Sequence, residues 1–79
     1  MKAMVSVPVE FRSPEDIVAF VDIVSKFDYD VDLRCGRYVV DAKSMMSAFT
    51  LSSSKNVEMQ IHASECSQLI SDVAQYICA

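Results

Sequence analysis

Three groups of side chains could take part in chemistry. They are the single histidine, three aspartates at every second position from 28 to 32, and two serines that precede apolar segments. His62 lies between Ile61 and Ala63 in an alternating segment, so alternation places its ring on the face opposite the buried residues. Metal sites need several ligands, and a lone histidine is too few. We therefore expect His62 to be a solvated strand residue, and we predict neither a metal site nor a cofactor.

The alternating acids at 28–32 could suggest a calcium loop. Such loops need a glycine inside the loop and a bidentate glutamate at its end, whereas Leu33 and Arg34 follow here. On a strand, Asp28, Asp30 and Asp32 would project from one side about 7 Å apart, too far to chelate one ion together. We expect a solvated acidic face.

Nothing else in the sequence forms a catalytic set. Cys35, Cys66 and Cys78 fit neither a CxxC pair nor any zinc spacing, so we expect reduced thiols in a cytosolic protein. The sequence pairs no nucleophile with a base and has no glycine-rich loop for phosphate. We therefore predict that the protein is not an enzyme.

Composition narrows the class further. Seventy-nine residues suffice for a single domain over residues 1–79, and 52% hydrophobic residues with one Gly and two Pro favour a regular, packed chain. The net charge of −4 argues against nucleic-acid binding, which needs a basic surface. The first residues contain no long apolar run, so we expect a cytoplasmic protein without membrane insertion.

Hydrophobic periodicity predicts the elements that position these residues. Period-two alternation indicates strands near 3–11, 29–33, 38–41 and 57–63, with Pro8 at a bulge or near a strand end. Stripes at spacings of three and four indicate helices from 14 to 27, from 43 to 51, and from 64 or 66 to 77. Gly36 suits a tight hairpin turn. The order βαββαβα predicts an α+β open-faced sandwich, with a mainly antiparallel four-stranded sheet and three helices on one face.

Both serines stand where helices should begin. Ser13 precedes Pro14 and two acids, the pattern of an N-cap, a proline at the first helical position and carboxylates that complement the helix dipole. Ser44 precedes the shorter helix, whose apolar residues we expect to be mostly buried: Met45, Met46, Ala48 and Phe49.

The segment 42–51, Ala-Lys-Ser-Met-Met-Ser-Ala-Phe-Thr-Leu, resembles the A-K-S-[IL]-[MF]-x-x-[ML]-x-L signature of HPr, the histidine-containing phosphocarrier family of the bacterial sugar phosphotransferase system. The resemblance extends in one ungapped register from about Ser13 to the last helix. It implies an HPr-like fold and partners among phosphotransferase-system proteins, a regulatory kinase or a transcription regulator.

The family's L-H-x-R-P-A-A active site is absent. The ungapped register places Ser13 at the family's histidine, Glu15 at its arginine and Asp16 at its proline, while a one-residue gap would pair Phe11 with the leucine and Arg12 with the histidine. Neither register supplies an imidazole. The two acids would repel a phosphoryl group, so we expect Ser13 to cap the helix without carrying phosphate.

The family resemblance gives Ser44 a second interpretation besides N-cap. In many Gram-positive bacteria the matching serine of HPr is phosphorylated by a dedicated kinase, although Ser47 here replaces the usual glycine of that pattern. Met45, Met46 and Phe49 form a soft apolar cluster that is either core or partner surface. The candidate partner-binding residues are Arg12, Ser13, Lys43, Met45, Met46 and Phe49.

We therefore predict a degenerate HPr relative that binds proteins without relaying phosphate through histidine, with phosphorylation at Ser44 as a candidate switch. Two alternatives stay open. One is an unrelated binding or structural module on the same fold, with the sheet face as its surface. The other is a phosphocarrier that uses an atypical residue.

Overall fold

The computed structural model describes residues 4–51 and 53–78. Its elements follow the predicted order and add one turn of 3₁₀ helix near the end. In chain order they are β1 (Val5–Val9), α1 (Pro14–Val24), β2 (Val31–Cys35), β3 (Tyr38–Asp41), α2 (Met45–Phe49), β4 (Val57–Ile61), α3 (Ser67–Asp72) and η1 (Ala74–Tyr76).

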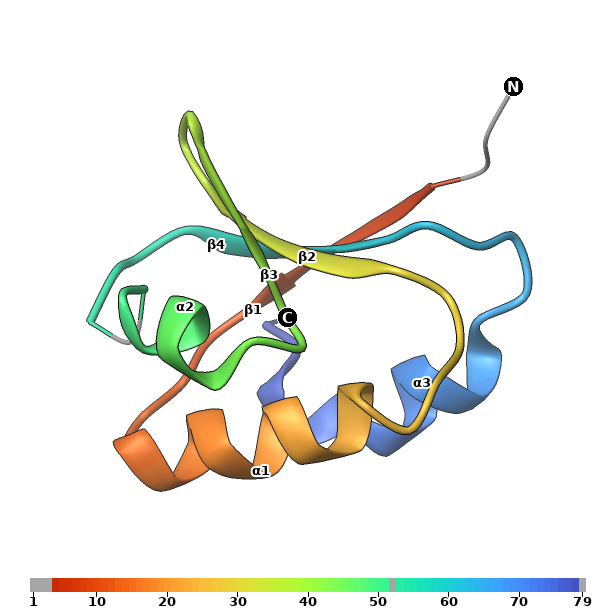
Figure 1. Ribbon diagram of the computed structural model, residues 1–79, viewed down its shortest axis with the longest axis horizontal. Helices are drawn as coiled ribbons and strands as arrows, with labels where there is room; N and C mark the ends of the chain where they lie inside the picture. The colour runs from red at the N-terminus through yellow and green to blue at the C-terminus, as the bar shows by residue number, and fades with distance from the viewer. Residues whose placement is uncertain (1–3, 52, 79) are drawn as a thin grey trace.

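The four strands form one antiparallel sheet in the order β1-β4-β2-β3. The three α-helices lie on one side of it and leave the other side open, as Figure 1 shows. Inward-facing strand residues meet the apolar stripe of α1, and Phe20, Leu33, Met59 and Ile61 are fully buried. The predicted open-faced α+β sandwich is confirmed.

β1 illustrates how alternation sets the buried face. Its inner residues alternate with exposed Ser6 and Pro8, as predicted, whereas the predicted start at residue 3 lies outside the described residues. Pro8 is the penultimate residue of the strand and keeps a regular register opposite Glu58. Its carbonyl accepts a bond from Cys78 N–H, so its missing N–H also faces away from β4 and removes no ladder bond.

The turn between β2 and β3 consists of two residues, Gly36 and Arg37, because Cys35 pairs directly with Tyr38. Gly36 has a φ of 63°, which suits the first position of a type II′ turn, and a side chain there would be strained. The predicted glycine hairpin is confirmed.

The end of the chain differs from the single helix predicted to residue 77. α3 ends at Asp72 because Val73 has non-helical angles, and the backbone of Ile77 is extended. Tertiary pairing explains the change: Ile77 bridges Val9, and Tyr76 O accepts from Glu10 N–H.

Within the described residues, no helix is both long and apolar enough to cross a bilayer.

Candidate functional site

The N-terminus of α1 is where sequence analysis placed the site. Ser13 occupies the N-cap with extended backbone angles, as predicted, but its hydroxyl makes no capping hydrogen bond, so that part of the prediction is wrong. The carboxylate of Asp16 is used instead. Its Oδ2 accepts from Arg12 N–H at 2.9 Å, so the carboxylate bonds the residue that precedes the N-cap.

Two carboxylates therefore stand in the first turn of α1. Glu15 is exposed, and Asp16 is half-buried beside the aromatic cluster of Phe11, Phe20 and Tyr76. Burial, and then the charge of Asp16, raise the pKa of Tyr76. The positive end of the helix dipole is thus already occupied by negative charge.

The single histidine lies elsewhere. His62 follows β4 on the open face of the sheet, as alternation predicts, but it is not merely solvated. Its Nε2 lies 2.8 Å from Asp32 Oδ2, and both side chains are about one-third exposed, at 31% and 30%. The ring lines a surface hollow together with Asp30, Asp32 and Asp41. Within the described residues, no group of side chains has the arrangement of a metal site.

Ser44 and Lys43 connect α2 to its neighbours. Ser44 is the N-cap of α2, as predicted, and its hydroxyl accepts from Ser47 N–H at 3.4 Å. The ammonium of Lys43 donates to the carbonyl of Phe27 at 2.6 Å, which ties the start of α2 to the turn after α1. Lys43 is therefore partly a structural residue rather than a freely available cation.

The methionines of α2 do not behave as a buried stripe. Met46 is 83% exposed and Phe49 is 38% exposed, whereas Ala48 is fully buried. The prediction that Met46 and Phe49 would be mostly buried is wrong, because a helix of five residues turns only a narrow face toward the sheet. Val18 of α1 is likewise 46% exposed.

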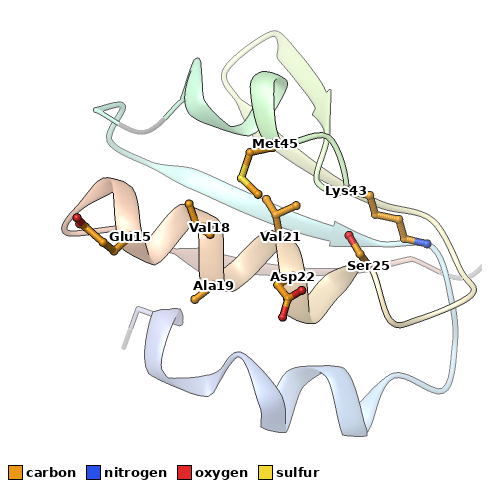
Figure 2. Close-up of a pocket in the computed structure, with 8 residues that line it drawn as sticks. All are labelled: Glu15, Val18, Ala19, Val21, Asp22, Ser25, Lys43 and Met45. Atoms are coloured by element: carbon orange, nitrogen blue, oxygen red, sulfur yellow. The ribbon is translucent and has the colours of Figure 1, made fainter.

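A groove of about 600 Å³ separates the two helices. Figure 2 shows Met45 pointing from α2 toward α1, with Glu15 and Lys43 near opposite ends of the groove. The lining is mostly apolar and comes from Val18, Ala19 and Val21 of α1. The groove thus joins the start of α1 to the start of α2.

Comparison with known proteins agrees with this arrangement. The sequence model of one family, described as "PTS HPr component phosphorylation site", matches residues 17–77. The chain belongs to the PTS HPr family. Membership makes it a phosphocarrier-like protein of the phosphotransferase system and not an enzyme in the ordinary sense.

Solved structures of HPr proteins share the fold. The phosphocarrier protein HPr from Bacillus anthracis superposes with a TM-score of 0.74 at 20% identity, covering 96% of this chain and 99% of the other. HPr-C-His from Thermoanaerobacter tengcongensis gives 0.67 at 18% identity, covering 92% and 88%. A search of curated proteins gave no significant match.

Only part of the predicted HPr site comes together. Lys43 and Met45 line the groove and Met46 and Phe49 are exposed on α2, whereas Arg12 lines a different hollow, with the loop 53–57. Ser13, the N-cap of α1, lines neither of these two areas. The sequence analysis missed Val18. Val18 directly follows the buried Ile17 and therefore falls outside the apolar stripe of α1. An apolar residue outside the stripe indicates an exposed apolar side chain, and this signal could have identified Val18.

Proposed function

We propose that this protein is a protein-binding member of the HPr family that does not relay phosphate through a histidine at α1. The observation that carries the proposal is the first turn of α1. It begins Ser13-Pro14-Glu15-Asp16, has no imidazole, and already holds two carboxylates, one of them bonded to Arg12 N–H.

The chemistry of phosphate transfer supports this proposal. A carrier needs a ring nitrogen whose phosphorylated form is close in free energy to the donor, and it needs a helix end that accepts added negative charge. Serine phosphate esters are too stable to pass the group onward easily. Glu15 and Asp16 would in addition repel a phosphoryl group that arrived at Ser13.

The proposed docking site is the α1–α2 surface, which we define as Val18, Met45, Met46 and Phe49. Three of these apolar side chains are more than one-third exposed. Val18 and Met45 line the groove between the helices, and Met46 and Phe49 belong to the same short helix as Met45. Exposed apolar residues grouped in this way mark interaction sites in soluble proteins. Unbranched methionines can also adapt to partners of different shape. Lys43 and Asp22 provide opposite charges at the rim.

Intact-mass spectrometry tests the proposal directly. The protein is incubated with phosphoenolpyruvate and the first enzyme of the phosphotransferase system, with the Bacillus anthracis HPr as a positive control in the same mixture. We expect the control to gain one acid-labile phosphoryl group and this protein to gain none. Stoichiometric acid-labile addition would overturn the proposal, and the modified residue would then identify an atypical phosphocarrier.

Replacing Met46 with aspartate should weaken binding to the first enzyme of the system at least tenfold. The change places a charge in the most exposed part of the α1–α2 surface, where an apolar partner would have to desolvate it. Isothermal titration calorimetry measures the affinity. Met4→Asp is the matched control, since Met4 is an exposed methionine outside that surface, at 50% exposure.

Equal losses in the two variants would argue against the α1–α2 surface. Amide shifts on titration with the same enzyme provide a second readout. Shifts in α1 and α2 support HPr-like docking, whereas shifts confined to the open sheet face, near Asp32 and His62, favour the unrelated binding module.

Phosphorylation at Ser44 is a second candidate function. Its hydroxyl is half-buried at the N-cap and makes only a long hydrogen bond, and it stands between Lys43 and Met45, which both line the groove. A phosphate there would face the first amides of α2 and change the charge beside the docking surface. Incubation with ATP and the family's serine kinase should add an acid-stable phosphoryl group that is lost in Ser44→Ala. If the kinase adds no phosphoryl group, this candidate function is excluded.

A further inference from the structure

The outer edge of β3 has unpaired backbone groups. Cys35 and Tyr38 close the two-residue hairpin, and Ala42 N–H donates to Val31 O at 2.9 Å further along the same pair of strands. Hydrogen-bonded pairs alternate along an antiparallel ladder, so the N–H and C=O groups of Val39 and the N–H of Asp41 point away from β2. No other described segment pairs with this edge.

The two edge strands of the sheet differ in how far the rest of the chain covers them. The outer edge of β1 carries Pro8 and is covered by the chain at Ile77 and Cys78. The β3 edge carries Tyr38 and Val39, which are 69% and 54% exposed, and no proline. An apolar, uncovered edge is a template for pairing with another strand.

The charges along β3 determine which strand fits. The segment 37–41 reads Arg-Tyr-Val-Val-Asp, basic at one end and acidic at the other. If a second copy lies antiparallel with Val39 opposite Val39, each Arg37 faces an Asp41 and each Tyr38 faces a Val40. In the same register the two Val39 residues exchange both of their outward hydrogen bonds, and each Asp41 N–H meets an Arg37 carbonyl.

We propose that two copies of this chain associate through β3, in an antiparallel register centred on Val39. The two-fold symmetric pairing joins the two four-stranded sheets into one continuous sheet. It also covers the exposed Tyr38. On the helix side of the hairpin, the ring of one copy lies beside Val40 of the other, at an apolar hollow of about 330 Å³ that includes Thr50 and Leu51. This inference is independent of the proposed docking through α1 and α2.

Sedimentation equilibrium over about 10 μM to 1 mM tests the association, because a dimer with a Kd in that range changes from mostly monomer to mostly dimer across it. We expect the apparent mass to rise toward that of a dimer. Arg37→Asp and Asp41→Arg should each raise the Kd about tenfold or more, because like charges then face each other at both ends of the pairing.

Mixing the two variants provides the decisive result. In a heterodimer the aspartate introduced at position 37 of one copy faces the arginine introduced at position 41 of the other. At the opposite end of the pairing, the native Asp41 of the first copy faces the native Arg37 of the second. The mixture should therefore recover the association that each variant loses alone. Lys26→Asp is the matched control, since it makes the same change of charge at an exposed residue just after α1, outside the sheet. Thermal melts check that each variant is folded.

Hydrogen exchange gives an independent readout. The amides of Val39 and Asp41 should become protected as concentration rises, and the amide of Ser6 on β1 should not change. A monomer throughout the range would overturn the proposal. A dimer that is insensitive to the substitutions at Arg37 and Asp41 would also overturn it, because association would then use another surface.

Discussion

Replacing Phe20 with alanine should lower the free energy of unfolding by about 3–5 kcal/mol, the range for deleting a buried aromatic ring. Phe20 is fully buried at the centre of α1. Its ring packs edge-on against Phe11 at 5.0 Å and Tyr76 at 5.9 Å between centroids. This loss is a large part of the total free energy of unfolding, which is roughly 4–12 kcal/mol for a domain of this size.

Urea unfolding followed by circular dichroism measures this cost. Val18→Ala is the matched control, because Val18 lies on the same helix but is 46% exposed, and it should change stability by no more than about 0.5 kcal/mol. Similar losses in both variants would show that α1 packs on the sheet through a different face.

Installing a histidine at position 13 should not by itself create a phosphocarrier. In the first-enzyme assay, we expect Ser13→His to accept phosphate far more slowly than the Bacillus anthracis HPr. Adding Glu15→Arg should raise the rate about a hundredfold. A change of one charge about 5 Å away is worth about 3 kcal/mol at an effective dielectric constant of 20, which corresponds to roughly a hundredfold in rate.

The rate of acid-labile phosphoryl addition is the measurement for both variants. Ser13→His combined with Asp28→Arg makes a similar change of charge beyond the other end of α1, and it should leave the slow rate unchanged. A rate for Ser13→His alone equal to that of the control HPr would show that the missing imidazole, and not the acids, is the whole obstacle.

The fold could be predicted because local patterns and packing agree. Alternation around Val31 and Leu33, the stripe through Ile17 and Phe20, and the only glycine at the hairpin each correspond to one element. The C-terminal segment could not be predicted in this way. The pairing of Ile77 with Val9 is a contact between residues far apart in sequence, and it overrides the helical period of the last residues.

The site was less predictable because side-chain partners are not encoded in spacing. Ser13 and Ser44 are equally good N-cap residues by type, yet only Ser44 makes a capping bond. In α1 the N–H of Asp16 donates to the carbonyl of Ser13 and not to its hydroxyl. Likewise, alternation places His62 on the open face but cannot show that Asp32 lies diagonally opposite it, since that depends on how β4 aligns with β2.

The order of strands in the sheet has a consequence for synthesis on the ribosome. β4 lies between β1 and β2, although both of those strands are translated earlier. Until β4 leaves the exit tunnel, β1 has no neighbour in the sheet and the β2–β3 hairpin has only itself. We therefore expect folding to occur late, as one cooperative event after most of the chain has emerged, and more slowly than in helical proteins of this length, whose contacts are local.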